Sequence, residues 1–96
     1  MRATEEDIEA FVAEQWLAFL TDAQRLISID SSLDAEHAAL GAPFGPGPRA
    51  ALDEALAIAQ RMGLEPHDGD GYAGFADLPG GSGQQIGVIG HVDVVP

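Results

Sequence analysis

The sequence predicts an α/β fold, because two stretches with helical spacing of apolar residues are followed by three short stretches typical of β-strands. The first helix is expected to end near Ile27, and the second to run from Pro48 to Met62. The short strands are expected over residues 64–67, 72–78 and 85–90. This order of elements is typical of an α/β sandwich, and we expect all 96 residues to form part of one domain.

The first helix has a start signal and one apolar face. Thr4 can cap it, and Asp7 completes a pattern similar to a capping box. Acidic side chains in the first turn suit the positive end of the helix dipole. The apolar residues recur at three- and four-residue spacing and are Ile8, Phe11, Val12, Trp16, Phe19, Leu20, Ala23 and Ile27. We therefore expect this stripe to pack into a core, against a larger body.

A segment rich in proline and glycine separates the two helices. Residues 41–48 hold three Pro and three Gly, which excludes a helix interior or a central strand and predicts a semi-rigid connector. Pro48 suits the first position of the second helix, and Gly63 is expected to cap its end. The expected buried face of that helix consists of Leu52, Ala55, Leu56, Ala59 and Met62.

Charge and composition exclude several classes of protein. The formal net charge is −12, with four Arg and no Lys, so the chain lacks the clustered cations that bind nucleic acid or an anionic membrane surface. It has no cysteine, so any metal ion must be bound by His and carboxylate side chains. The N-terminus lacks the pattern of a secretory signal, and the apolar runs are too short to span a bilayer. We therefore expect a cytoplasmic location.

The stretch that carries chemistry runs from Ile86 to Pro96. It resembles a buried apolar strand that ends at Gly90, followed by His91 and then Asp93. In open α/β sheets, binding sites form beyond the carboxyl ends of the strands, where we expect His91. Residues i and i+2 of an extended chain point to the same side, so Asp93 can contact His91. A carboxylate on the second ring nitrogen of a metal-binding His fixes its tautomer, which favours His91 as a metal ligand and Asp93 as its partner.

A His and an Asp separated by one residue also occur without any metal. A histidine at the end of a strand can simply meet solvent or a backbone carbonyl. The apolar neighbours favour the functional interpretation, because burying His91 and Asp93 unpaired among valines and isoleucines costs free energy.

Four stretches together resemble one protein family. Residues 90–96, Gly-His-Val-Asp-Val-Val-Pro, closely resemble the first metal motif of the aminoacylase–carboxypeptidase family of di-zinc hydrolases. Residues 42–48, Ala-Pro-Phe-Gly-Pro-Gly-Pro, and residues 71–74, Gly-Tyr-Ala-Gly, look like its dipeptidase V and Xaa-His dipeptidase branch. Residues 26–31, Leu-Ile-Ser-Ile-Asp-Ser, resemble the family's early Leu-Ile-x-Ser segment. The matches occur in family order and cover nearly the whole chain.

The resemblance implies a fold and a mechanism. The chain is expected to be the N-terminal part, residues 1–96, of a three-layer α/β/α zinc-peptidase catalytic domain. Two Zn²⁺ ions would share a water molecule, polarise the peptide carbonyl and lower the pKa of that water, with a Glu as general base. His91 would bind one zinc ion, and Asp93, as a catalytic residue, would orient it. The implied substrate is a dipeptide with a free amino terminus.

The chain departs from the family pattern in its length. The bridging Asp, the Glu pair, a later Asp and the last His of the family all lie beyond the matched stretches, as does a lid or dimerisation domain. We therefore predict that the 96 residues alone are inactive. An N-acyl amino acid deacylase of the same family and a non-catalytic acidic interaction domain are the alternatives. The connector and the Tyr-Ala-Gly segment at residues 72–74 favour the dipeptidase over the deacylase. The unpaired edge of the last expected strand counts against a free-standing interaction domain.

Overall fold

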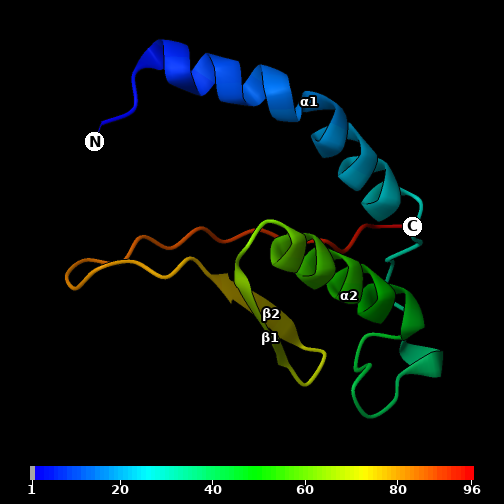
Figure 1. The fold of residues 1–96 in the computed structure, drawn as a ribbon. Helices are drawn as coiled ribbons and strands as arrows, with labels where there is room; N and C mark the ends of the chain where they lie inside the picture. Colours follow the sequence, from blue (N-terminus) through cyan, green and yellow to red (C-terminus); the bar gives the residue numbers. More distant parts are fainter. Residues whose placement is uncertain (1) are drawn as a thin grey trace.

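The computed structural model describes residues 2–96 and shows a small mixed α/β arrangement with two helices and one two-stranded sheet. The elements are helix α1 (Glu5–Ile27), the short 3₁₀ helix η1 (Ala35–His37), helix α2 (Pro46–Arg61) and strands β1 (Glu65–Gly69) and β2 (Ala73–Asp77). Helix α2 contacts both strands on one side and α1 on the other (Figure 1). The mixed α/β class is confirmed, and the three-layer catalytic domain stays a prediction.

Helix α1 begins and ends where the sequence predicts. Thr4 Oγ1 accepts a hydrogen bond from the Asp7 backbone N–H at 3.1 Å, and the Asp7 carboxylate accepts one from the Thr4 N–H at 3.0 Å. Hydrogen bonding of the Asp7 carboxylate to the Thr4 backbone N–H, and next to the Thr4 side chain, lowers the pKa of Asp7. The helix ends at Ile27, and the hydroxyl of Ser28 donates to the carbonyl of Arg25 at 2.7 Å. The predicted capping box is therefore confirmed.

The apolar stripe of α1 is not packed as predicted. Phe11 is 62% exposed and Trp16 is 50% exposed, although the rings of Trp16 and Phe19 stack with centroids 5.5 Å apart. The expected core contact is missing because no further layer covers this face within residues 2–96. An ion pair of 3.2 Å between Asp22 and Arg61 joins α1 to α2 instead. In the described part of the chain, neither helix combines the length and the apolar character that crossing a membrane requires.

The Pro/Gly connector ends earlier than predicted. Gly45 has a φ of 103°, and a Cβ at this position would lie 2.6 Å from Cβ of Asp34, so the N-cap of α2 requires glycine. Helix α2 then begins at Pro46 and not at Pro48, because a proline without an N–H fits the first helical position equally well there. The helix is followed by Gly63 at a φ of 88°, which confirms the predicted glycine cap.

The inner face of α2 is only partly buried. Ala51 is 1% exposed, whereas the predicted core residue Met62 is 70% exposed. Leu52 and Leu56 pack on the hairpin at Gly74, where an added Cβ would lie 2.8 Å and 2.9 Å from their Cδ atoms. This close approach explains why β2 carries a glycine directly under the helix.

Strands β1 and β2 form an antiparallel hairpin in register from Glu65 opposite Asp77 to Gly69 opposite Ala73. Two of the three predicted strands are thus confirmed, and the first of them extends further, to Gly69. Tyr72, expected in the second strand, lies in the turn, where its N–H donates to the carbonyl of Gly69 at 3.1 Å.

The hairpin turn has left-handed backbone, and the aromatic side chains beside it are exposed. Asp70 and Gly71 have φ values of 58° and 79°, the left-handed region that Asp and Gly tolerate best. Tyr72 is 67% exposed and Phe75 is 60% exposed, so neither side chain packs into a core within the described residues. The ring of Phe75 instead stacks on the ring of His67, with the two centroids 4.6 Å apart.

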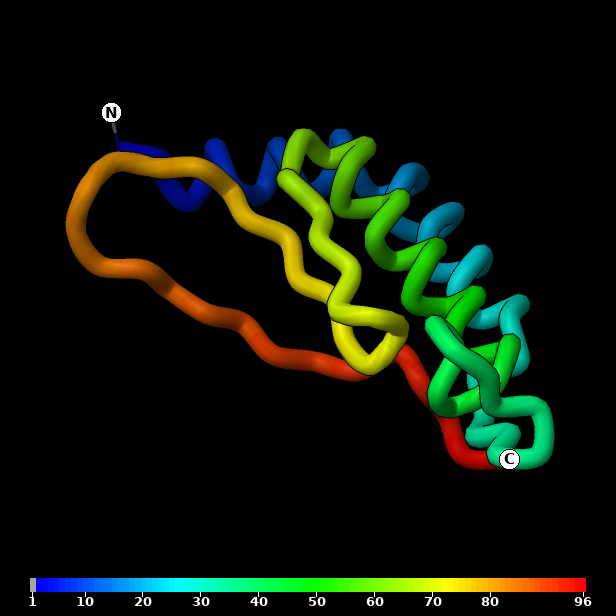
Figure 2. The backbone as a smooth tube through the Cα atoms, turned by 90° about the horizontal axis from the view of Figure 1, so that it is seen from below, coloured from blue at the N-terminus to red at the C-terminus, as the bar shows by residue number. Residues whose placement is uncertain are grey.

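The third predicted strand, residues 85–90, is not formed in the described structure. The chain beyond β2 swings away from the hairpin and returns toward the segment between α1 and α2 (Figure 2). Ile86, Val88 and Ile89 are therefore 91%, 95% and 98% exposed. The segment has the apolar pattern of a strand, but a strand needs a neighbouring backbone to pair with, and this segment has none within residues 2–96.

Candidate functional site

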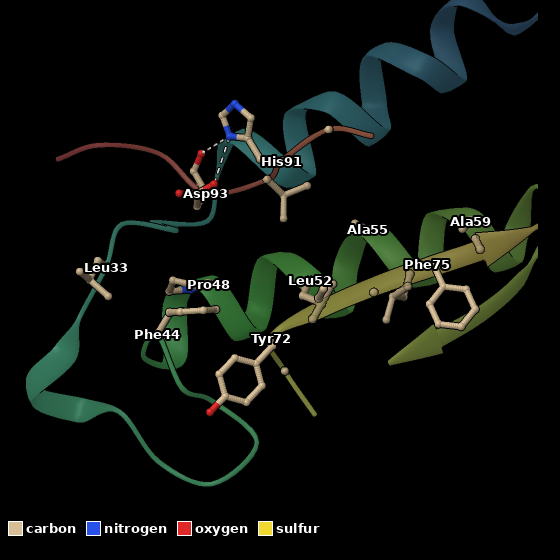
Figure 3. A pocket seen from close by; sticks show the side chains of 17 residues that line it. Leu33, Phe44, Pro48, Leu52, Ala55, Ala59, Tyr72, Phe75, His91 and Asp93 are labelled. Atoms are coloured by element: carbon tan, nitrogen blue, oxygen red, sulfur yellow. Dashed lines mark hydrogen bonds and ion pairs between the residues drawn. The ribbon is translucent and has the colours of Figure 1, made fainter. Parts of the chain in front are cut away.

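The two residues of the candidate metal motif lie side by side. His91 Nδ1 is 3.1 Å from Asp93 Oδ1 and 3.2 Å from the backbone oxygen of Asp93 (Figure 3). Both oxygens are acceptors, so the contact favours the tautomer in which Nδ1 carries the proton. That tautomer leaves the lone pair of Nε2 for a metal ion. The predicted contact is present, and the roles of the two residues stay predictions.

The pair fits one ligand position of a metal site but does not complete one. The His91 and Asp93 side chains are 82% and 69% exposed. Among residues 2–96, no group of three or more His, Cys, Asp or Glu side chains is arranged to hold a metal ion. Because a protein zinc site uses at least three protein ligands, the described residues would supply at most one ligand with its orienting carboxylate and do not form a complete zinc site.

The motif is held by a residue that lies far away in the sequence. The hydroxyl of Ser31 donates to the backbone oxygen of Val92 at 2.8 Å, and the N–H of Val94 donates to the backbone oxygen of Ser31 at 3.4 Å. Ser31 is 1% exposed. These two bonds bind the backbone on both sides of Asp93, so the motif is anchored although the strand that precedes it is not.

A groove of about 620 Å³ lies between α2, β2 and the metal motif. Its walls are mostly apolar and include Leu33, Phe44, Pro48, Leu52, Ala55, Leu56, Ala59, Tyr72 and Phe75, with His91 and Asp93 on the opposite side (Figure 3). The rings of Phe44 and Tyr72 pack edge to face, with their centroids 5.7 Å apart. The groove therefore places apolar surface next to the one candidate ligand.

Arg49 joins the start of the Pro/Gly connector to strand β1 beside the hairpin turn. Its guanidinium donates to the Gly41 carbonyl at 3.1 Å, to Asp53 at 2.8 Å and to Asp68 at 2.6 Å. The bond from Arg49, followed by one from the Gly71 N–H, holds the pKa of Asp68 below its ordinary value. The same bonds to Asp68 and Asp53 raise the pKa of Arg49. The connector and the hairpin turn are thereby fixed to the same end of α2.

Sequence reasoning missed Ser31 and Arg49. Ser31 is the last residue of the stretch 26–31, and the resemblance of that stretch assigns it no role. Arg49 is one of only four cations in an acidic chain, and this scarcity was a usable signal that its position matters. The contacts of Ser31 and the Arg49–Asp68 ion pair are not local, so no spacing rule could have identified those partners. The Arg49–Asp53 pair has the i,i+4 spacing of a helical ion pair and could have been read from the sequence.

A second His–Asp pair lies outside the groove. Nδ1 of His37 is 2.9 Å from both carboxylate oxygens of Asp34. The His37 side chain is 66% exposed and lies on η1, and Asp34 also caps that turn through the His37 N–H. This pair is a structural cap, and it offers a control for the His91–Asp93 pair.

Comparison with known proteins gives a consistent result, although no family model matches the chain. The chain is 42% identical over 79 residues to the Beta-Ala-Xaa dipeptidase of Lactobacillus delbrueckii subsp. lactis, which covers 82% of this chain and 17% of that protein. It is 46% identical over 78 residues to a candidate dipeptidase of Staphylococcus haemolyticus, and 44% identical over 77 residues to one of Staphylococcus aureus. Each of these two matches covers 80% of this chain and 16% of the relative.

The chain thus spans about a sixth of the length of the curated relatives it matches. The level of identity and the share of this chain that is covered confirm the resemblance to dipeptidases that the sequence motifs carry. Over about four fifths of its length, the chain is therefore a homologue of proteins named as dipeptidases.

Proposed function

We propose that the chain is the N-terminal part of the catalytic domain of a zinc-dependent dipeptidase. The observation that carries the proposal is the contact of 3.1 Å between His91 Nδ1 and Asp93 Oδ1, found in a relative of proteins named as dipeptidases. A carboxylate on one ring nitrogen is the arrangement that prepares the other nitrogen for a metal ion.

The residues of this chain would contribute binding and orientation. His91 would donate the Nε2 lone pair, while Asp93 holds the proton on Nδ1, fixes the ring orientation and makes the imidazole a stronger donor. When bound, two zinc ions supply a water of lowered pKa and polarise the carbonyl of the scissile peptide bond. The apolar groove beside His91 would be closed by further parts of the catalytic domain, contributed by the remaining length that the relatives have.

The 96 residues are expected to be inactive by themselves. The described residues offer one ligand position, and three or more donors are needed to retain a catalytic zinc ion. Measurable zinc-dependent cleavage of a dipeptide by the isolated chain, at the rate of a full-length relative, would contradict this expectation.

A chimeric enzyme provides the direct test. The matched stretch of the Lactobacillus dipeptidase is replaced by the 79 matched residues of this chain, and hydrolysis is measured with a dipeptide and with an N-acetyl amino acid. Cleavage of the dipeptide supports the proposal, whereas a clear preference for the N-acetyl amino acid supports the deacylase alternative. A folded chimera that retains zinc but cleaves neither substrate supports a non-catalytic role for this segment.

Three variants of the chimera test the assigned roles. We expect H91A to lose bound zinc and activity, and D93N to lose roughly 10- to 100-fold in metal affinity or rate. H37A removes another histidine that pairs with an aspartate, away from the groove, and is expected to leave both quantities unchanged. If H91A retained both zinc, measured by elemental analysis, and activity, the proposed ligand would be wrong.

A further inference from the structure

The attachment of the metal motif depends on a single buried polar residue. Ser31 is 1% exposed, and both its hydroxyl and its carbonyl bind the backbone that flanks Asp93. Val92 accepts the hydroxyl at 2.8 Å, and Val94 donates to the carbonyl at 3.4 Å. Elsewhere in residues 78–96 the backbone makes no hydrogen bond to another element of the described structure. Ser31 is therefore where the motif is fastened to the folded part of the chain.

The position of Ser31 is in turn set by the start of α2. A Cβ added at Gly47 would lie 1.9 Å from the backbone oxygen of Asp30 and 3.6 Å from Cα of Ser31. The backbone at Asp30 thus rests directly on the first turn of α2, and any side chain at position 47 would push it away. Glycine at this place in the Pro/Gly connector allows Ser31 to reach the motif.

We propose that Ser31 is a positioning residue for the His91–Asp93 pair and that Gly47 is the platform on which it rests. The inference rests on the proposed function for its purpose, since positioning matters only if His91 is a ligand. Fixing the backbone on both sides of Asp93 limits the directions in which the carboxylate can point. The His91 ring is then kept in the orientation and tautomer that a metal ion requires, although both side chains are themselves exposed.

This assignment also connects three stretches that are far apart in the sequence. The stretch 26–31 ends in Ser31, the connector contains Gly47, and the metal motif contains Val92 and Val94. In the structure they form one stack of contacts, from α2 through Asp30 and Ser31 to the motif. Gly47 leaves room for the backbone at Asp30, and Ser31 in turn hydrogen-bonds to the backbone of the metal motif.

The test uses nuclear magnetic resonance on the complete 96-residue chain, without metal or substrate. In S31A we expect the exchange protection of the Val94 amide to fall roughly two- to tenfold, the range that follows from losing one hydrogen bond. The ¹⁵N shifts of the His91 ring are expected to move toward the tautomer protonated at Nε2, at unchanged pH. The matched control S32A removes a hydroxyl whose bond of 2.6 Å is made to Asp30 and should change neither signal.

A second variant perturbs the same contact from the other side. G47A keeps every hydrogen-bonding group but places a methyl group against the Asp30 carbonyl, so it should lower Val94 protection and shift the His91 signals in the same direction as S31A. G80A is its control, because nothing lies within 4 Å of a Cβ at that position. If S31A does not fold, G47A decides the question by the same two signals.

Two results would overturn the inference. One is a folded S31A in which Val94 protection and the His91 ring signals are those of the unchanged chain. The other is an equal loss of protection at the Tyr72 amide in the hairpin turn, which would show a general loss of stability and no positioning role. Because these measurements involve no metal and no substrate, they remain valid whether or not the chimeric enzyme proves to be a dipeptidase.

Discussion

Replacing Gly71 by alanine tests whether the hairpin turn and the connector are packed as closely as the structure shows. Gly71 has a φ of 79°, and a Cβ there would lie 2.1 Å from the oxygen and 2.7 Å from the carbon of the Gly41 carbonyl. Both atoms belong to the backbone, so they cannot rotate aside as a flexible side chain could. The turn or the connector must therefore move by about an ångström to accept the methyl group.

The cost of G71A has two parts. The left-handed backbone costs a non-glycine residue about 1–2 kcal/mol, and overpacking adds about 1–3 kcal/mol. The smaller entropy of the unfolded alanine chain returns roughly 0.4–1 kcal/mol. We expect a net loss of about 2–4 kcal/mol, which is a large part of the roughly 5–15 kcal/mol that stabilises a typical domain.

Gly63 provides a matched control for this prediction. Its φ of 88° is similar, but nothing lies within 4 Å of an added Cβ. G63A should therefore cost only the backbone part, about 1–2 kcal/mol before the entropy correction. The assay is urea unfolding followed by circular dichroism, with the free energy of unfolding obtained by linear extrapolation. Equal losses in G71A and G63A would refute the close approach of Gly71 to the connector.

Three further predictions concern separate parts of the chain. T4A removes the side-chain half of the capping box and should cost α1 about 1 kcal/mol, measured as a loss of helical circular dichroism. The control T21A should be neutral, because the Thr21 hydroxyl bonds only to the backbone carbonyl one turn back. The pKa of Asp68 is lowered in the folded chain, so its contribution to stability is complete above the ordinary value of 3.8 and is lost as the pH falls through the lower folded pKa. D68N should remove this step from a plot of urea midpoint against pH, and an unchanged acid dependence would contradict the ion pair. The exposed stripe of α1 should bind the dye ANS, and changing Phe11 and Trp16 to glutamine should reduce the dye fluorescence without loss of helix content.

Local signals predicted the helices well. The capping box at Thr4 and the glycine cap at Gly63 were both read from residue types at fixed offsets, and both are present. The start of α2 was misplaced because Pro46 and Pro48 satisfy the same rule for the first helical position. The choice between them depends on Gly45, whose approach to Asp34 is a tertiary contact.

Burial and strand pairing could not be predicted equally well. The apolar spacing around Trp16 and the apolar run at Ile86 indicate surfaces that need a partner, but periodicity does not say where the partner lies. The contact between His91 and Asp93 followed from the two-residue period of an extended chain, which is local. The contact of the motif with Ser31 is not local and has no signature in the spacing of residues.

The separation between Ser31 and Val92 has a consequence for the order of folding. These residues are 61 positions apart, and bringing the ends of such a segment together costs roughly 3–4 kcal/mol in the length-dependent part of the loop-closure entropy. Helix α2 and the hairpin use contacts of much shorter range and should form first, since nearby contacts are reached with little loss of entropy. The candidate ligand would then be the last part of the segment to settle. During synthesis, His91 could reach its final position only after Val94 had emerged from the ribosome and bonded to Ser31, with Ser31 already packed against α2.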